Sequence, residues 1–265
     1  MTASIHPSSV IHDGAEVSPS AYIGPFCEIG PKVRVGERVK LHGRVTIAGE
    51  TTLGQDVEVY PGAVLGQPAQ SLGASADPGT GLEVGDRTIL REHVTLHAGT
   101  LADSRITRIG ADCFFMAYCH VGHDCQIGDR NVYANTVNLA GHIKTGDHVW
   151  IGGSVAIHQF SEVGDHAFIA GGAIVVGDVI PFGLVSGNRA SLQGLNVKGL
   201  SRRGVSRSDL HALRRAYKAL FEGEGAFRDR IQALQESGDL GDHPRQILEF
   251  IKKKRLRPLC MPDRS

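Results

Sequence analysis

Two histidines and an aspartate lie close together in the stretch CHVGHDC, residues 119–125, where they could serve either metal or proton chemistry. An imidazole can accept a proton from a hydroxyl near neutral pH, and a carboxylate on its other ring nitrogen would fix the tautomer and stabilise the imidazolium. Three or four His, Cys or carboxylate groups converging at about 2 Å would bind zinc instead. The elements that carry these residues decide between the two.

The sequence has a strong internal period. An apolar residue, aliphatic in most hexads, recurs every six positions from Ile5 to Leu65, from Val84 to Leu96 and from Ile109 to Val175, and only Thr145 in this series is plainly polar. The fifth residue of most hexads is small. Such hexads are typical of a parallel β-helix, in which three short strands form one triangular coil and coils stack about 4.8 Å apart. We therefore predict an all-β parallel β-helix over residues 1–190, with its interruptions at 71–83 and 102–108 expelled as loops. Known hexapeptide-repeat helices are left-handed, and this resemblance predicts the same hand here.

Helical spacing replaces the hexads in the last part of the chain. Apolar residues recur at helical intervals from Leu210 to Phe221, behind a serine N-cap at 206 or 208, and again near 227–234 and 247–251. The sequence therefore predicts a small α-helical C-terminal domain over residues 191–265.

The two predicted domains differ in charge. Residues 201–265 hold 15 Lys and Arg against 9 Asp and Glu, whereas residues 1–200 hold 13 against 19. The basic tail favours an acidic partner, unless its charges only solvate a helical surface. No apolar run of 18 residues occurs, and the first residues lack the charged and apolar regions of a signal peptide. We expect a cytoplasmic protein with no membrane span and no nucleic-acid partner.

Most of the cysteines fall at one position of the repeat. The small fifth position of a hexad holds Cys27, Cys113, Cys119 and Cys125. No CxxC motif occurs in the sequence. We therefore expect small buried side chains and neither a disulfide nor a metal site at these positions.

The period also predicts which residues share a face. With the interruptions expelled, the hexads that open at Leu96, Val121, Leu139 and Ile157 stack in one column on successive coils. Their next residues would gather on one face: His97, His123, Asp124, Gly141, His142, His158 and Gln159, with His120 at the preceding corner. Imidazoles that converge from distant parts of a sequence indicate a site, although an exposed polar face is the alternative.

Proton transfer fits this column better than zinc binding. The stacked triangular coils form a prism, and a face of this prism displays its side chains roughly in parallel, so they do not converge on an ion. Gamma-class carbonic anhydrases, which hold zinc on this fold, use a pair of ligands five residues apart, and the cluster lacks such a pair. His123 can act as a general base, and Gly141 can offer a backbone N–H to a developing oxyanion. Asp124 can orient the His123 ring only if the chain turns at that corner, because neighbours on an extended strand point in opposite directions. These are the parts of an acyl transfer.

Five motifs make the chain resemble a known family along nearly its whole length. They are HVGHDC (120–125), LAGH (139–142), AIHQF (156–160), SGNRA (186–190) and GLNVKGLSRRG (194–204). In these motifs the chain is similar to the bacterial UDP-N-acetylglucosamine O-acyltransferases, the LpxA family, which catalyse the first step of lipid A biosynthesis. The resemblance implies a homotrimer with active sites between prisms and no metal or other cofactor. It also implies an R-3-hydroxyacyl chain delivered by acyl carrier protein to the 3-OH of UDP-N-acetylglucosamine.

The resemblance assigns roles to individual residues. The family's general base falls on His123, with Asp124 orienting it, and its oxyanion glycine falls on Gly141. The family's acyl-length ruler falls on Gly171, which would leave the groove open for a longer chain. The other residues that the family implies for binding sugar, phosphate, acyl chain or carrier protein are Gln70, Ser71, His120, His142, His158, Gln159, Asn196, Lys198, Arg202 and Arg203.

Three departures from the family pattern concern the sugar nucleotide. The first loop has Ser71 and Gly73 where the family has an acid or amide and a lysine, Lys198 replaces an acidic residue, and Arg189 replaces a histidine. Lys198 or Arg189 would supply the missing positive charge. The departures leave open a related N-acyltransferase acting on a 3-amino sugar nucleotide. Outside acyl transfer, the alternatives are a zinc-dependent hydratase and a non-catalytic trimer.

Overall fold

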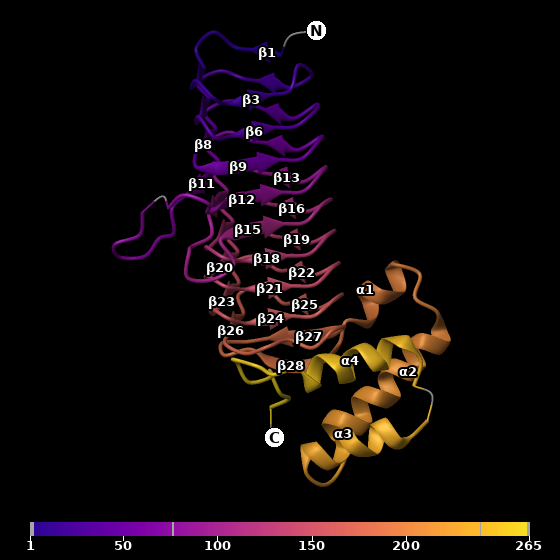
Figure 1. Ribbon diagram of the computed structural model, residues 1–265. Coiled ribbons are helices and arrows are strands. Elements are labelled where there is room, and N and C mark those ends of the chain that lie inside the picture. The colour runs from indigo at the N-terminus through magenta and orange to yellow at the C-terminus, as the bar shows by residue number, and fades with distance from the viewer. Residues whose placement is uncertain (1–2, 76, 239, 264–265) are drawn as a thin grey trace.

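The computed structural model describes residues 3–75, 77–238 and 240–263. Short strands wind into a stack of coils, and successive strands join three different sheets in turn, with parallel pairing between coils (Figure 1). The helices lie at the C-terminal end of this stack. The predicted fold class, a hexapeptide β-helix followed by a small helical region, is confirmed.

The three sheets form the faces of the stack, and we number them first, second and third by the order in which the chain enters them. The first sheet contains, in spatial order, β1 (Ser4–Ile5), β4 (Tyr22–Ile23), β7 (Lys40–Leu41), β10 (Glu58–Val59), β13 (Ile89–Leu90), β16 (Phe114–Phe115), β19 (Val132–Tyr133), β22 (Trp150–Ile151), β25 (Phe168–Ile169), β27 (Gly183–Ser186) and β28 (Ser191–Leu195). The second sheet contains β2 (Val10–Ile11), β5 (Glu28–Ile29), β8 (Thr46–Ile47), β11 (Val64–Gln67), β14 (Thr95–His97), β17 (His120–Val121), β20 (Asn138–Leu139), β23 (Ala156–Ile157) and β26 (Ile174–Val175). The third sheet contains β3 (Glu16–Val17), β6 (Arg34–Val35), β9 (Glu50–Leu53), β12 (Gly81–Val84), β15 (Ile106–Ile109), β18 (Gln126–Ile127), β21 (Lys144–Thr145) and β24 (Glu162–Val163).

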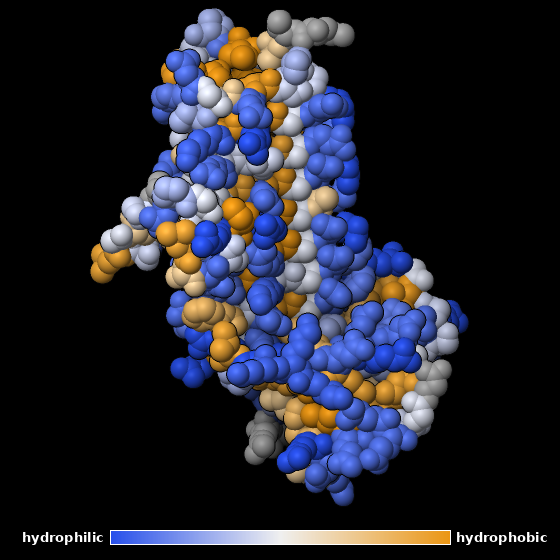
Figure 2. All heavy atoms as spheres, viewed as in Figure 1, coloured by the Kyte–Doolittle hydropathy of each residue, from blue (hydrophilic) through white to orange (hydrophobic). Residues whose placement is uncertain are grey.

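The interior of the stack is filled by the residues that open the hexads. Ile47, Leu96 and Ile151 are essentially inaccessible to solvent, and hydrophilic side chains run in rows along the outside (Figure 2). The polar exception, Thr145, is satisfied inside the stack, because its hydroxyl accepts from the Asn131 amide and shares a hydrogen bond with the Tyr133 hydroxyl, both at 3.1 Å. Buried polar groups are tolerated when they are paired in this way.

The cysteines behave as buried apolar side chains, as predicted. Cys27, Cys113, Cys119 and Cys125 are all at most 1% exposed, and their thiols are free. Burial raises the pKa of Cys113 and Cys125 to about 12, so both thiols stay protonated near neutral pH. They therefore contribute packing and are poor nucleophiles.

The corners of the stack depend on a backbone conformation that recurs every six residues. Tyr118, Asp124, Arg130, Thr136 and His142 all have φ between 56° and 63°, in the left-handed region. That conformation costs a non-glycine residue about 1–2 kcal/mol, and here the stacked coils hold it in place. At Asp124 it provides the turn that a contact between His123 and Asp124 requires.

The two predicted interruptions are real, but their limits were wrong. β12 already begins at Gly81 and β15 at Ile106, because Leu82 and Thr107 are buried and pair with each other in the third sheet. The first expelled loop therefore lies between β11 and β12, with residues 68–75 and 77–80 described, and the second covers residues 98–105. The first projects from the stack beside β11 and β12 (Figure 1).

The C-terminal region starts with strand pairing that the sequence period did not reveal. β28 pairs antiparallel with β27, and the helices α1 (Val197–Arg202), α2 (Arg207–Tyr217), η1 (a π-helix, Lys218–Glu222), α3 (Phe227–Glu236) and α4 (Asp242–Lys252) follow. The N-cap of α2 is Ser206, as predicted, and its hydroxyl accepts from the Asp209 N–H at 3.1 Å. α3 and α4 correspond to the other predicted helices, whereas α1 was not predicted. A domain boundary at residue 190 stays a prediction. None of the helices in the described ranges is long and apolar enough to cross a membrane.

Candidate active site

The predicted column of histidines is present. Strand pairing places Leu96 beside Val121, Val121 beside Leu139, and Leu139 beside Ile157. Imidazoles from different coils consequently meet, with 5.2 Å between the ring centroids of His97 and His120 and 4.8 Å between those of His123 and His142. Residues far apart in sequence therefore form one cluster at the edge between the second and third sheets.

His123 and Asp124 form a hydrogen-bonded pair at the centre of this cluster. His123 Nδ1 lies 2.8 Å from Asp124 Oδ2, and the His123 side chain is 24% exposed whereas that of Asp124 is fully buried. Burial acts to raise the pKa of Asp124, but hydrogen bonds from His123, Thr100 and Ser104 outweigh it, so this pKa lies below its ordinary value. The ionised carboxylate only accepts, so the proton resides on Nδ1 and leaves the Nε2 lone pair free as a base.

Gly141 lies directly against this free nitrogen. A Cβ built on Gly141 would come within 2.7 Å of His123 Nε2, closer than real Cβ contacts. The Gly141 N–H donates to no atom among the residues that the structure describes. The free nitrogen of His123 and an unpaired backbone donor thus lie close together, and an acyl transfer needs a base and an oxyanion donor near each other.

A loop that sequence analysis treated only as an interruption holds the cluster together. The Thr100 N–H and hydroxyl donate to Asp124 at 2.9 and 2.7 Å, and the Ser104 hydroxyl donates to it at 3.0 Å. In the same loop, Asp103 Oδ2 lies 2.6 Å from His142 Nδ1, and the His142 ring stacks on Phe160 with centroids 4.4 Å apart. The signal that could have indicated these residues is the polar sequence GTLADS, inserted one coil before HVGHDC.

The geometry favours a proton-transfer pair over a metal centre. Ligand atoms of His123, Asp124 and His142 lie within 4.8 Å of one another, so the three residues could in principle share an ion. However, two ligands of a tetrahedral zinc ion lie about 3.3 Å apart, whereas His123 Nδ1 and Asp124 Oδ2 lie 2.8 Å apart. Both Asp124 oxygens also accept hydrogen bonds from the loop. That the site works without a metal stays a prediction.

The other histidines of the column have distinct environments. His120 shares a hydrogen bond of 2.8 Å with the Thr95 hydroxyl, and burial, with a smaller effect from His97, lowers its pKa to about 4. It is therefore neutral near pH 7. His158 and Gln159 are exposed and contact Arg257, a residue that sequence analysis did not single out.

A second group of predicted residues lines a different surface. Next to the first sheet lies a pocket of about 650 Å³ whose lining is both apolar and basic. Its apolar lining includes Trp150, Phe168 and Leu184, and its basic lining consists of Lys198, Arg202 and Arg203. Burial lowers the pKa of Arg203, and no carboxylate contributes to that change. Exposed apolar surface beside cations suits an amphipathic anion.

Asn196 also lines this pocket, but its side chain is already engaged. It is the N-cap of α1, where it accepts from the Gly199 N–H at 3.1 Å and donates to the His166 carbonyl at 2.9 Å. Its predicted role in ligand binding stays a prediction, and the contacts show that it positions the helix carrying Lys198 and Arg202.

The remaining predicted residues lie outside the histidine cluster. Gly171 follows β25, and a Cβ there would meet only Gly153 backbone atoms, the nearest at 3.3 Å. Gln70 and Ser71 are exposed in the first expelled loop. That loop starts at the cluster, because the His97 Nδ1–H donates to the Pro68 carbonyl at 2.7 Å.

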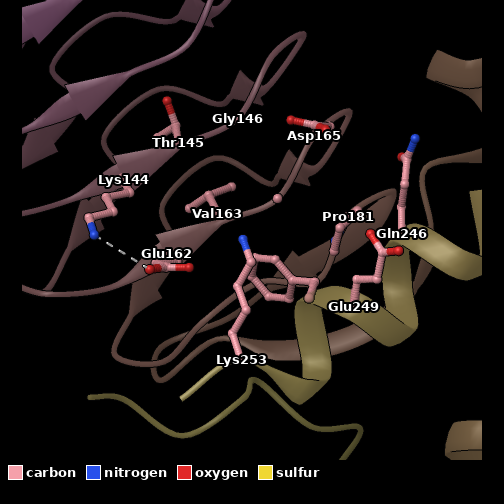
Figure 3. A pocket seen from close by; sticks show the side chains of 12 residues that line it. Lys144, Thr145, Gly146, Glu162, Val163, Asp165, Pro181, Gln246, Glu249 and Lys253 are labelled. Carbon is pink, nitrogen blue, oxygen red and sulfur yellow. Dashed lines mark ion pairs between the residues drawn. The ribbon is translucent and has the colours of Figure 1, made fainter. Parts of the chain in front are cut away.

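Another cleft, of about 520 Å³, lies between the third sheet and α4 (Figure 3). Its lining carries both signs of charge, including Lys144 and Glu162, which approach to 3.9 Å, and Glu249 and Lys253 on the helical side. It contains no predicted site residue.

Comparisons with known proteins show which family the chain resembles. Residues 178–260 match the family described as UDP N-acetylglucosamine O-acyltransferase, domain 2, and residues 106–132 match the bacterial transferase hexapeptide family. The acyl-(acyl-carrier-protein)–UDP-N-acetylglucosamine O-acyltransferase of Sinorhizobium fredii is 41% identical over 80% of this chain and 78% of its own length. The protein of the same name from Paracoccus denitrificans is 46% identical over 73% and 72%.

Solved structures show the same similarity. LpxA from Acinetobacter baumannii has a TM-score of 0.91 and 35% identity, over 96% of this chain and 99% of that one. The UDP-N-acetylglucosamine acyltransferase of Francisella novicida has a TM-score of 0.93 and 31% identity, over 98% and 95%.

Proposed function

We propose, because this chain belongs to the acyl-(acyl-carrier-protein)–UDP-N-acetylglucosamine O-acyltransferase family, that His123 is the general base of its acyl transfer. The observation that carries the proposal is the pairing of His123 with buried Asp124 while its other nitrogen faces Gly141. His123 Nε2 takes the proton of the acceptor hydroxyl as its oxygen attacks the acyl thioester carbonyl. The Gly141 N–H stabilises the oxyanion, and the departing thiolate receives the proton from the imidazolium.

The proposed substrates are an R-3-hydroxyacyl carrier protein and the 3-OH of UDP-N-acetylglucosamine. The pocket beside the first sheet supports both, because its apolar lining suits an acyl chain and its cations, Lys198, Arg202 and Arg203, suit phosphates. The basic C-terminal region suits an acidic carrier protein. A cytoplasmic location also stays a prediction.

We propose that the enzyme is a homotrimer, because its two groups of site residues lie on different faces of one chain. The histidine cluster follows strands of the second sheet, whereas the pocket and Gly171 border strands of the first. A head-to-tail contact between copies would bring the cluster of one against the pocket of the next, and such contacts close into rings.

The test of this function is a transfer assay with purified protein, R-3-hydroxyacyl carrier proteins of several lengths and UDP-N-acetylglucosamine, read by mass spectrometry. Gain of one hydroxyacyl group by the sugar nucleotide supports the proposal. Product only with a 3-amino analogue would mean that Ser71, Gly73 and Lys198 accompany a changed acceptor and an amide product. Loss of activity with a chelator would support a zinc enzyme instead.

Gly141→Ala should lower kcat about 10²-fold without unfolding the coils. The added methyl group would lie 2.7 Å from His123 Nε2, so it displaces the base, and a misplacement of about 1 Å costs this much. Steady-state kinetics and thermal unfolding measure the two effects. Gly30→Ala is the control, since its Cβ would meet backbone at 3.2 Å in a coil far from the cluster. Equal losses of activity in both variants would contradict this role for Gly141.

Gly171→Met should shift the preferred acyl chain to a shorter one. Gly171 has no side chain, and a Cβ built there would meet only backbone atoms of Gly153. A methionine side chain would therefore fill space that a long acyl chain is expected to occupy. Competition between carrier proteins bearing chains of different length measures the preference. An unchanged preference with lower overall activity would show that position 171 does not limit chain length.

A further inference from the structure

The chain after α4 is fastened to the end of the coil stack, and we call residues 253–261 the C-terminal strap. Arg255 forms a buried ion pair with Asp178 at 2.7 Å, with side chains 12% and 2% exposed. The Arg255 guanidinium also lies 4.3 Å from the centroid of the Phe250 ring in α4. A buried charge pair of this kind is costly to break, so it fixes the start of the strap.

The far end of the strap is fixed by backbone hydrogen bonds. The Asp178 N–H donates to the Pro258 carbonyl at 2.7 Å, and the Cys260 N–H donates to the Asp178 carbonyl at 2.8 Å. Gly177 permits this approach, because a Cβ there would lie 2.5 Å from the Pro258 oxygen. The strap is thus held on both sides of residue 257.

Arg257 lies between these two anchors and reaches the histidine column. Its Nε donates to the Gln159 carbonyl at 2.9 Å, and one terminal nitrogen donates to His158 Nδ1 at 2.7 Å. A guanidinium can only donate, so Nδ1 of His158 must accept, and the ring proton resides on Nε2. The contact thereby favours the tautomer in which His158 Nε2 is the donor.

Without Arg257, the His158 ring could form a different hydrogen bond and adopt the other tautomer. His158 Nδ1 also lies 3.3 Å from the Gln159 carbonyl oxygen, which could accept a proton from Nδ1. That contact stabilises the opposite tautomer and would leave Nε2 as an acceptor. Arg257 occupies both groups at once and therefore selects the tautomer.

We propose that Arg257 is a positioning residue for the acceptor substrate, which holds His158 as an Nε2–H donor toward an oxygen of the sugar nucleotide. The inference rests on the proposed function, and it assigns His158, one of the residues that the family resemblance implies for substrate binding, to the sugar nucleotide. It makes the C-terminal strap part of the acceptor site, although the strap follows α4 by sequence and lies about 100 residues from His158.

Arg257→Ala should raise the KM for UDP-N-acetylglucosamine about tenfold, the loss expected for one hydrogen bond to a charged substrate. The kcat and the KM for acyl carrier protein should change less than about twofold. Lys254→Ala is the matched control, because it removes one positive charge from an exposed position of the same strap. A general effect of charge on the acidic carrier protein would appear in both variants and in the carrier KM.

The tautomer of His158 gives a readout independent of catalysis. In ¹⁵N-histidine-labelled protein at about pH 8, where imidazoles are neutral, Arg257→Ala should move the His158 signals from the Nε2–H pattern toward the Nδ1–H pattern. His158→Gln assigns those signals by difference. An unchanged tautomer, or an unchanged sugar-nucleotide KM in an active enzyme, would overturn the inference about Arg257 alone. A wild-type protein that transfers no acyl group would overturn the proposed function, and the NMR result would still decide the tautomer.

Discussion

Replacing His123 with alanine should remove nearly all acyl transfer, with kcat lower by roughly 10²–10⁴-fold. The imidazole is the only group in the cluster whose free nitrogen faces Gly141 while its other nitrogen is fixed by a buried carboxylate, within the residues described. Its side chain is 24% exposed and lies outside the aliphatic interior, so the coils should keep their thermal stability. Product formation by mass spectrometry at saturating substrates, with circular dichroism during heating, measures both.

The same change at His12 is the control for this prediction. His12 is exposed near the N-terminal end of the stack, where its ring pairs with Glu28 at 3.2 Å, so His12→Ala should keep full activity. If His123→Ala retains more than about a tenth of the wild-type kcat, acyl transfer does not depend on this base, since general-base help is worth more than that. A non-catalytic trimer would show no transfer in either variant or in the wild type.

The coil stack could be predicted because one simple rule governs it. The hexad places an aliphatic residue inside at a fixed interval, and register then follows from counting, so the pairing of Leu96 with Val121 and of Val121 with Leu139 is as predicted. Segments that lack the six-residue repeat could not be placed from the sequence. The antiparallel strand β28, the short helix α1 and the C-terminal strap carry no period, and their positions depend on contacts such as that of Arg255 with Asp178.

The residues of the candidate site also differ in whether the six-residue repeat predicts their positions. The clustering of His123, His142 and Gly141 follows from register alone, whereas the contact between His123 and Asp124 depends on the left-handed turn at Asp124, which the sequence only made a condition. Thr100, Asp103, Ser104 and Arg257 could not be placed, because they lie in segments without a repeat. All four act on site residues through side chains that the fold brings from 20 to 99 positions away.

The shape of the coil stack separates the two parts of the proposed site within one chain. A triangular stack turns its sheets away from one another, so the edge that carries His123 and the pocket that carries Arg202 and Arg203 face in different directions. The cluster carries the proposed base and oxyanion donor, whereas the pocket is lined by apolar side chains and by the cations of Lys198, Arg202 and Arg203. In the proposed homotrimer, a head-to-tail contact would bring these two parts together.

Mixed trimers should therefore recover activity from two inactive parents. His123→Ala damages the cluster and leaves the pocket intact, while the double change Arg202→Ala and Arg203→Ala damages the pocket and leaves the cluster intact. In any head-to-tail ring of three that contains both kinds of chain, one contact joins an intact cluster to an intact pocket. Trimers purified through a different tag on each parent should show about one third of wild-type turnover, against nearly none for either parent.

The control for this experiment pairs two changes in the same half of the site. His123→Ala and Asp124→Ala both damage the cluster, so their mixed trimers contain no intact cluster at all and should stay inactive. Recovery in that pair would show contamination or exchange with wild-type chains. If neither mixture recovers, although both contain both tags, the base and the phosphate-binding arginines act from one chain, and the site does not lie between copies.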